Sequence, residues 1–255
     1  MIPKILHYCW FGGAEKTKLQ KKCIESWKKH CPDYEIIEWN EKNFDVNCNA
    51  YCKEMYRNKK WAFLSDYARL KIIYDNGGIY IDTDVELLKS FDDLLYKDAF
   101  MGEEQTGRIA TGLSFGAVKG HYAIKENAEY YEKQSIPSTA ICVDITTDIF
   151  KKYGYIGCDK TPVLINGVMI YPEEYFCPYS YFTGEKNITK NTYSVHHYEG
   201  SWESDEKKKK HKKEIRKEKI ERRIDYIKHI PNRLIRKLLG KKRYKKLKDS
   251  VKKSP

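Results

Sequence analysis

The sequence predicts an α/β fold with a Rossmann-like, mainly parallel sheet, and three observations support this class. Short apolar segments rich in Ile, Val and aromatic residues alternate along the chain with segments of helical periodicity. The clearest helix, residues 61–76, ends at Gly77 and is followed at once by a strand, residues 79–87. The chain of 255 residues is long enough to bury a substantial core. Strands joined by helices form parallel sheets, because a crossover helix returns the chain to the same edge.

The remaining elements follow from the same patterns. Leu19, Cys23 and Trp27 repeat every four residues, so the segment around them is an amphipathic helix. The expected elements of the first half are a strand and turn at 5–13, that helix at 16–30, a strand at 34–39 and a weakly patterned helix at 41–56. The second half is less regular, and there we expect strands at 99–103, 113–118, 169–172 and 193–198 and a helix at 121–133.

Charge divides the chain into two parts. Residues 203–255 hold 23 of the 48 Lys and Arg residues but 8 of the 36 Asp and Glu residues. The tail therefore carries a net charge of +15, and residues 1–202 carry −3. A mildly acidic body without a recognisable nucleic-acid module argues against a nucleic-acid partner. We expect a folded domain at 1–202 and a separate basic tail at 203–255.

The tail has the pattern of basic amphipathic helices. Its apolar residues recur at steps of three or four, for example at Ile227, Ile230 and Leu234, and Lys and Arg crowd the opposite faces. Helices of this kind lie in the interface of membranes that contain anionic lipid. The tail is therefore predicted to be a peripheral membrane anchor. A solvated charged tail, or a helix that packs on the body or on another subunit, is the alternative.

The cysteines and the N-terminus indicate the cellular compartment in which the protein is expected. The eight cysteines include no C-x-x-C pair, which argues against a structural zinc site. The chain opens without the apolar core of a signal peptide, and no apolar run reaches about 18 residues. We expect free thiols in a reducing cytoplasm, with the protein peripheral at the inner face of the cell membrane.

Two carboxylates mark the candidate site. If the strand at 79–87 persists, Tyr80, Asp82 and Asp84 share one face, and the two carboxylates lie about 7 Å apart near its carboxyl end. Ligands of open α/β sheets bind at that end. Two close carboxylates repel one another unless a cation such as Mg²⁺ or Mn²⁺ lies between them, and the same cation can bind a diphosphate. An exposed acidic turn is the alternative for an isolated Asp-x-Asp.

The preceding helix carries a second polar pair. Residues 61–76 are apolar around nearly the whole circumference, as in a buried helix, yet Asp66 and Arg69 lie one turn apart on one face. A buried ion pair costs desolvation and is weak evidence for stability, so a polar cleft is the better explanation. The alternative is an internal salt bridge to a neighbouring element.

Three motifs in order carry a resemblance to a known family. They are residues 2–13 at the start of the chain, Ser65 to Arg69 with Tyr74 and residues 77–84 in the middle, and residues 196–202 at the end. Together they resemble glycosyltransferase family 32, which includes bacterial capsular-polysaccharide and lipopolysaccharide sugar transferases, and they are similar to the catalytic domains of clostridial glucosylating toxins. The resemblance covers residues 1–202 and implies an A-type glycosyltransferase fold with a DXD metal site.

The resemblance also implies roles for single residues. Trp10 would stack on the nucleotide base. Ser65, Asp66 and Arg69 belong to the motif that holds the donor sugar and phosphate. Asp82 would contact ribose and sugar, and Asp84 would bind Mn²⁺ or Mg²⁺. Tyr80 would lie against the donor. The catalytic group is therefore expected to consist of Asp66, Arg69, Asp82 and Asp84.

The closing motif would complete the site. His197 is the expected further metal ligand by its spacing to the glycine, with His196, Glu199 and Asp82 as the less certain ligands. Ser201 and Trp202 would cover the donor as a lid. Many relatives carry a Thr-Gly-Pro segment in the second half, where this chain has residues 140–147 without a Gly-Pro. The resemblance implies that this region lies on the acceptor side.

The resulting hypothesis is a metal-dependent, retaining glycosyltransferase. It would move a sugar from a nucleotide-sugar donor (a UDP- or GDP-sugar) to a glycan or lipid-linked acceptor in bacterial surface polysaccharide synthesis. A non-catalytic nucleotide-sugar or carbohydrate-binding protein and a toxin-like protein glycosyltransferase are the alternatives. The sequence does not identify the donor sugar, the base, the acceptor or a catalytic base.

Overall fold

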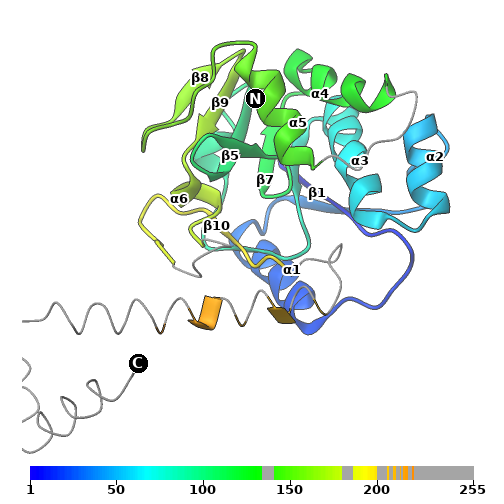
Figure 1. Ribbon diagram of the computed structural model, residues 1–255, viewed down its shortest axis with the longest axis horizontal. Coiled ribbons are helices and arrows are strands. Elements are labelled where there is room, and N and C mark those ends of the chain that lie inside the picture. Colours follow the sequence, from blue (N-terminus) through cyan, green and yellow to red (C-terminus); the bar gives the residue numbers. More distant parts are fainter. Residues whose placement is uncertain are drawn as a thin grey trace, which may run out of the picture. The chain divides into compact units, whose positions relative to one another are not determined.

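A computed structural model describes residues 1–133, 141–179 and 186–199, together with single helical positions between Glu206 and Ile220. The chain divides into two units, Met1–Glu203 and Ser204–Pro255. The first unit is the α/β fold drawn in Figure 1. The predicted apolar stripes of the tail from Ile227 onward lie outside the described residues, so the anchor stays a prediction.

The first unit is built on an eight-stranded mixed sheet. Parallel pairing joins β1 to β2 and β3, and β5 to β9, whereas the other strand pairs are antiparallel. The expectation of a mainly parallel sheet therefore holds for the N-terminal strands, and the later strands make the sheet mixed. In spatial order the strands are β2 (Glu35–Trp39), β1 (Ile5–Cys9), β3 (Gly78–Ile81), β7 (Ser114–Ala117), β5 (Ala99–Gln105), β9 (Val168–Tyr171) and β8 (Val163–Ile165), with β6 (Arg108–Ala110) paired to β5.

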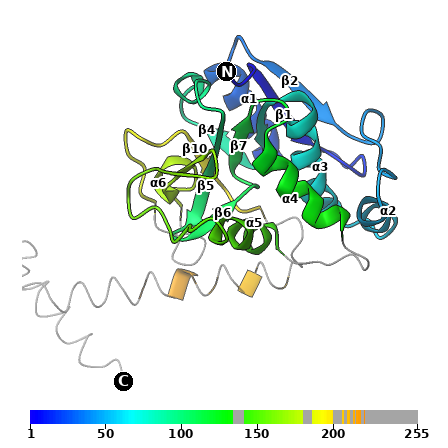
Figure 2. The same cartoon turned by 90° about the horizontal axis from the view of Figure 1, so that it is seen from above.

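Helices cover both faces of this sheet, as Figures 1 and 2 show from two directions. Two buried clusters fill the space between helices and sheet. One face carries α2 (Ala50–Arg57), α3 (Trp61–Asn76), α4 (Tyr122–Glu132) and α5 (Cys142–Lys151). The other carries α1 (Lys18–His30), the short 3-10 helix η1 (Asp92–Leu94) and α6 (Glu173–Phe176).

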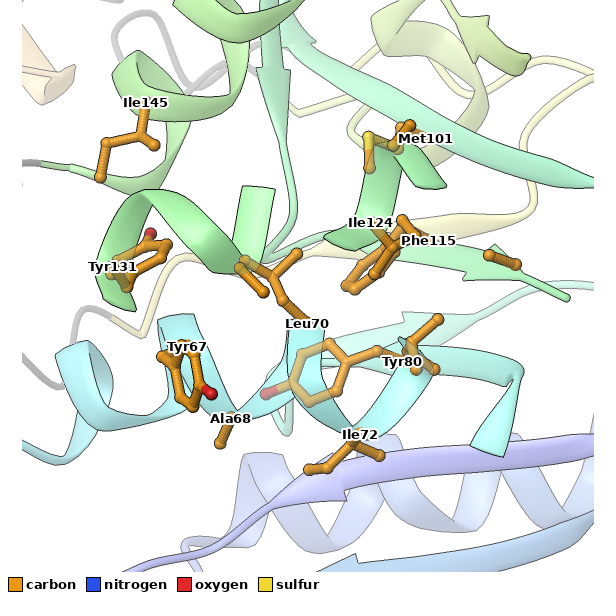
Figure 3. Packing of buried hydrophobic residues seen from close by; sticks show 14 of the residues in the cluster. Tyr67, Ala68, Leu70, Ile72, Tyr80, Met101, Phe115, Ile124, Tyr131 and Ile145 are labelled. Carbon is orange, nitrogen blue, oxygen red and sulfur yellow. The ribbon is translucent and has the colours of Figure 1, made fainter. Parts of the chain in front are cut away.

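Helix α3 is the central helix of the first cluster. Figure 3 shows Leu70 beside Tyr80 of β3 and near Phe115 of β7. The prediction that this helix is buried is confirmed, because Leu64, Leu70 and Ile73 are at most 1% exposed. The helix ends as expected at Gly77, whose φ of 72° lies in the left-handed region that favours glycine.

The strand expected at 79–87 is interrupted. It ends at Ile81, and Asp82 to Asp84 form a turn that is closed by a hydrogen bond from the Val85 amide to the Asp82 carbonyl, 3.0 Å long. The chain then enters β4 (Val85–Leu87), which pairs antiparallel with β10 (Ser194–His196) in a separate two-stranded sheet. This pairing brings the closing motif, more than 100 residues away in sequence, beside the two aspartates.

Other differences from the expected elements are local. The helix expected at 41–56 is shorter and ends one residue later, as α2 (Ala50–Arg57). It begins where the Asn49 side chain accepts a hydrogen bond from the Cys52 amide. The sequence pattern missed β6, β8 and α5, which are short or lie in the irregular second half. Among the described residues, no helix combines the length and the apolar character that a bilayer crossing requires.

Candidate active site

The two aspartates lie at the base of a cleft of about 370 Å³ at the carboxyl ends of β1 and β3. The cleft is bounded by the loop after β1, the first turns of α3, the start of α5 and the closing strand β10. The donor-binding residues expected in the described part of the chain all line it: Trp10, Ser65, Asp66, Arg69, Tyr80 and Asp82. Of the expected metal ligands, Asp84, His196 and Glu199 also line it, and His197 does not. The expected end of the sheet is thus where the polar residues meet.

Asp82, Asp84 and His196 form one compact group. One ligand atom from each residue lies within 4.8 Å of the others, and His196 Nε2 lies 3.2 Å from Asp84 Oδ1. Two carboxylate oxygens and one imidazole nitrogen facing a cleft suit a divalent cation such as Mn²⁺ that keeps further positions for substrate oxygens. These residues therefore fit the metal that the DXD motif implies.

The two carboxylates have different electrostatic environments. Burial opposes the ionisation of Asp84, but the charge of His196 and hydrogen bonds from His196 and the Glu199 amide hold the pKa at about 2. Burial raises the pKa of Asp82, against the neighbouring guanidinium of Arg69, and the charge of Asp84 adds to this rise. Asp84 is thus the more firmly ionised of the two.

The ion pair on α3 lines the cleft and also braces it. Arg69 Nη2 lies 3.0 Å from Asp66 Oδ1 and 3.6 Å from Asp82 Oδ1. Arg69 is 4% and Asp66 is 8% exposed, and burial raises the pKa of Asp66 to about 6 despite the nearby Arg69. Arg69 Nη1 is buried without a hydrogen-bond partner among the described residues. The pair is thus both a salt bridge to a neighbouring element and part of a polar cleft.

Tyr80 and Ser65 act mainly by holding their neighbours. The Tyr80 side chain is 1% exposed, and its hydroxyl donates to Asp82 Oδ1 over 2.8 Å. The guanidinium of Arg69 stacks on the Tyr80 ring at 4.9 Å. The Ser65 hydroxyl donates to the Trp61 carbonyl over 3.0 Å. Tyr80 therefore fixes the orientation of Asp82 and Arg69 and exposes little surface of its own to a donor.

Trp10 lies at the mouth of the cleft, directly after β1. Its ring is partly buried, its Nε1 donates to the Ala14 carbonyl over 2.8 Å, and Lys16 Nζ lies 4.9 Å from the ring centroid. Lys16 is held in turn by Glu38 at 2.7 Å. A partly buried tryptophan that lines a cleft is in the right place to stack on a ring-shaped ligand.

The closing motif places its two histidines differently. His196 lies in the cleft with Asp84, whereas His197 Nε2 lies 2.9 Å from Glu86 Oε2, outside the group of candidate metal ligands. Neighbouring residues of a strand point to opposite sides, so only one of the pair can face the aspartates. The geometry therefore favours His196, and not the expected His197, as the histidine ligand of the metal. Ser201 and Trp202 lie outside the described residues, and their lid role stays a prediction.

Glu199 is near the aspartates but its carboxylate is engaged elsewhere. Its amide donates to Asp84 Oδ2 over 2.8 Å. Its carboxylate accepts from Thr17 Oγ1 at 2.9 Å and from Gln20 Nε2 at 2.6 Å, at the start of α1. Glu199 thus ties the closing motif to α1 and to Asp84 through hydrogen bonds, and its carboxylate is not in the candidate ligand group.

Three further ionisable residues of the cleft were not predicted from the sequence. Cys9, Glu104 and Cys142 all line it. Glu104 could have been found, because it directly follows the strand expected at 99–103 and the carboxyl ends of strands form the site. Cys142 belongs to α5, and Ile141 to Val143 at its start lie in the cleft wall. This segment is part of the region assigned from sequence to the acceptor side.

Comparison with known proteins agrees with a sugar-binding cleft at the DXD motif. Residues 17–101 match the family model of the glycosyltransferase sugar-binding region containing a DXD motif. Over this stretch the match agrees with the resemblance to glycosyltransferase family 32 seen in the sequence. The stretch contains Asp66, Arg69, Asp82 and Asp84.

Two curated relatives are similar to slightly less than half of the chain. The chain is 30% identical over 127 residues to inositol phosphoceramide mannosyltransferase 3 of Schizosaccharomyces pombe, a match that covers 47% of this chain and 34% of the relative. It is 28% identical over 127 residues to the uncharacterized glycosyltransferase L373 of Acanthamoeba polyphaga mimivirus, covering 46% and 49% of the two chains. The matches thus span between a third and a half of these relatives.

A solved structure supports the fold. PaToxG glycosyltransferase superposes with a TM-score of 0.50 at 20% identity, covering 59% of this chain and 68% of the other. At this identity the likeness concerns the fold alone. Together with the mixed sheet and the DXD cleft, it confirms the A-type glycosyltransferase fold expected from the sequence.

Proposed function

We propose that the protein is a metal-dependent glycosyltransferase that takes a sugar from a nucleotide-sugar donor. The observation that carries this proposal is the group of Asp82, Asp84 and His196 at the base of the cleft, with the buried pair of Asp66 and Arg69 beside it. A bound divalent cation would neutralise charge on the leaving diphosphate. The family match to this same stretch of chain supports the donor class.

The residues of the cleft divide the work of binding. Asp82, Asp84 and His196 would hold the cation. Asp66 and Arg69 supply an acceptor and donors of hydrogen bonds that suit sugar hydroxyl and phosphate oxygens. Trp10 offers a face to the base at the mouth. Fixed charges of this kind stabilise a developing charge without reorganising, because they are set in place by the fold.

The finer assignments rest on the resemblance. We propose retention of configuration at the anomeric carbon, Mn²⁺ or Mg²⁺ as the cation, and a glycan or lipid-linked acceptor in bacterial surface polysaccharide synthesis. We also propose that the basic tail at 203–255 holds the protein to the inner face of the cell membrane, since its net charge of +15 favours an anionic surface. Flotation with neutral and anionic lipid vesicles tests that part.

A screen of nucleotide-sugars tests the proposal directly. UDP- and GDP-sugars with Mn²⁺ are added to the full chain, and the melting temperature is measured. A true donor at 100 times its dissociation constant stabilises the fold by about 2.7 kcal/mol. The proposal expects stabilisation by at least one donor and its loss when EDTA removes the cation. A flat response to every donor would contradict it, and binding without any turnover would favour the non-catalytic alternative.

A further inference from the structure

Lys16 is held against the aromatic ring that lies at the mouth of the cleft. Its Nζ lies over the Trp10 ring, 4.9 Å from the ring centroid, and 5.6 Å from the centroid of the Tyr8 ring. Trp10 lines the cleft and Lys16 does not. The ammonium group therefore covers one face of the Trp10 ring from outside the cleft and leaves the other face to a ligand.

A carboxylate of the neighbouring strand fixes this lysine in place. Glu38 Oε2 accepts hydrogen bonds from Lys16 Nζ over 2.7 Å and from the Tyr8 hydroxyl over 2.6 Å, and Glu38 Oε1 accepts from Asn40 Nδ2 over 3.1 Å. The parallel register of β1 and β2 sets Tyr8 beside Glu38, so the partner of Lys16 belongs to the sheet. Fixing a lysine side chain costs rotamer entropy, and here the fold meets that cost before any ligand binds.

The environment of Lys16 differs from that of an ordinary surface lysine. Its side chain is 19% exposed, whereas that of Lys21, which pairs with Glu15 a turn further along, is 57% exposed. Exposed ion pairs contribute little to stability. A cation that lies against an aromatic ring is attracted more strongly where water is excluded. The pair of Lys16 and Glu38 is thus suited to fix the Trp10 ring.

We propose that Lys16 is a positioning residue for the nucleotide base: it holds the Trp10 ring in the orientation on which the base of the donor stacks. The inference rests on the proposed function. A ring that is already fixed loses less freedom when the base binds, and this lowers the free-energy cost of binding. In this role Lys16 acts through Trp10 from outside the cleft, so its effect falls on ligands that carry a base.

Two probes separate this role from a simple attraction of anions. UDP or GDP, whichever matches the donor found in the screen, carries a base, and inorganic pyrophosphate does not. Each is titrated with Mn²⁺ into wild type and Lys16→Met, which keeps a long side chain and removes its charge. We expect the dissociation constant of the nucleotide to rise about threefold to tenfold, the range of a partly shielded cation–π contact, and that of pyrophosphate to stay unchanged.

Two further variants give the test a direction. Glu38→Gln removes the charge that holds Lys16 and makes the chain more positive. Positioning by Lys16 predicts weaker nucleotide binding in this variant, whereas attraction of an anion predicts tighter binding. Lys16→Arg keeps a cation that stacks on aromatic rings and pairs with carboxylates, so it should restore most of the nucleotide affinity that Lys16→Met loses.

Lys21→Met is the matched control, because it removes one charge from an exposed pair near the same loop. Its affinities should equal those of wild type. The inference is overturned by wild-type nucleotide affinity in Lys16→Met, by an equal loss for nucleotide and pyrophosphate, or by an equal loss in Lys21→Met. If Lys16→Met does not fold, tighter or unchanged nucleotide binding by Glu38→Gln also overturns it. A wild type that binds no nucleotide-sugar would overturn the proposed function itself.

Discussion

At the scale of single residues, two aspartates separated by one threonine are held in unlike states. Asp84 accepts from the Glu199 amide and lies beside His196, which stabilises its charge. Asp82 lies closer to the core, where the Tyr80 hydroxyl and the Arg69 guanidinium offset only part of the cost of burial. This asymmetry supports the assignment of Asp84 as the principal ligand and of Asp82 as the residue shared between cation and donor.

The role of Trp10 can be separated from stability by a matched pair of tryptophans. Trp10 Nε1 donates to the Ala14 carbonyl at 2.8 Å, and Trp39 Nε1 donates to His7 Nδ1 at 3.0 Å, but only Trp10 lines the cleft. Stacking of a base on an aromatic ring is worth about 1–3 kcal/mol. Trp10→Phe should therefore weaken donor binding at least about threefold, and Trp39→Phe should leave it unchanged, as measured by titration calorimetry.

The two melting temperatures complete that comparison. Each substitution removes one hydrogen bond, so each should cost stability on the order of 1 kcal/mol. Trp10→Phe with wild-type donor affinity and a much lower melting temperature would instead mark Trp10 as a core residue.

Much of the site could be predicted because its residues lie on regular elements. Asp66 and Arg69 share one face of α3 by helical periodicity alone, and they meet in the structure at 3.0 Å. The choice between His196 and His197 could not be made in this way, because the register of β10 on β4 decides which ring faces Asp84. Glu104 belongs to no motif, and only its place directly after the strand expected at 99–103 pointed to the site.

At the scale of elements, the break after β3 shapes the site. The sequence predicts one strand over residues 79–87, but the chain turns at Asp82 and continues as β4 in another sheet. The pattern of alternating residues does not reveal this break, because Val85 and Leu87 are buried in either arrangement. The turn places both carboxylates at the end of the sheet, where a continuous strand would have pointed them along one face.

The start of α1 supports the closing motif. Thr17 and Gln20 form a capping box, and both donate to the carboxylate of Glu199. Thr17→Ala removes the cap and one of these bonds, and caps are worth about 1 kcal/mol. We expect the melting temperature to fall by about 2–4 °C. Thr161→Ala, which removes only a 3.5 Å bond to the Cys158 carbonyl, should change it less. Equal melting temperatures for wild type and Thr17→Ala would contradict the contribution of this cap.

At the scale of the whole molecule, the two halves of the sheet differ in how well the sequence predicts them. The regular βα units of the N-terminal half gave the parallel strands β2, β1 and β3 correctly. In the second half, strands of three or four residues such as β6 and β8 are too short for a periodic signal, and their antiparallel pairing depends on contacts distant in sequence.

The basic tail at 203–255 is predicted to bind the chain to anionic membranes. The chain of 255 residues and a chain that ends at Trp202 are floated with vesicles of neutral or anionic lipid. Each basic residue near an anionic surface contributes about 1 kcal/mol, so the full chain should float with anionic vesicles and the shortened chain should not. Raising the salt concentration should weaken the binding, because it screens charge. Equal binding of both chains, or of neither, would contradict the anchor.

The most direct measurement of the central claim is Mn²⁺-dependent hydrolysis of the best donor by wild type and by Asp84→Asn. The amide keeps the size of the side chain and an oxygen for the Glu199 amide, but it removes the charge that binds the cation. Asp75→Asn, which alters an exposed partner of Lys71 on α3, is the control. We expect turnover by wild type and Asp75→Asn, and a loss of turnover of at least about 100-fold in Asp84→Asn with the melting temperature of the free protein retained. Wild-type turnover in Asp84→Asn, or undiminished turnover of wild type in EDTA, would contradict a metal-dependent transferase centred on these aspartates.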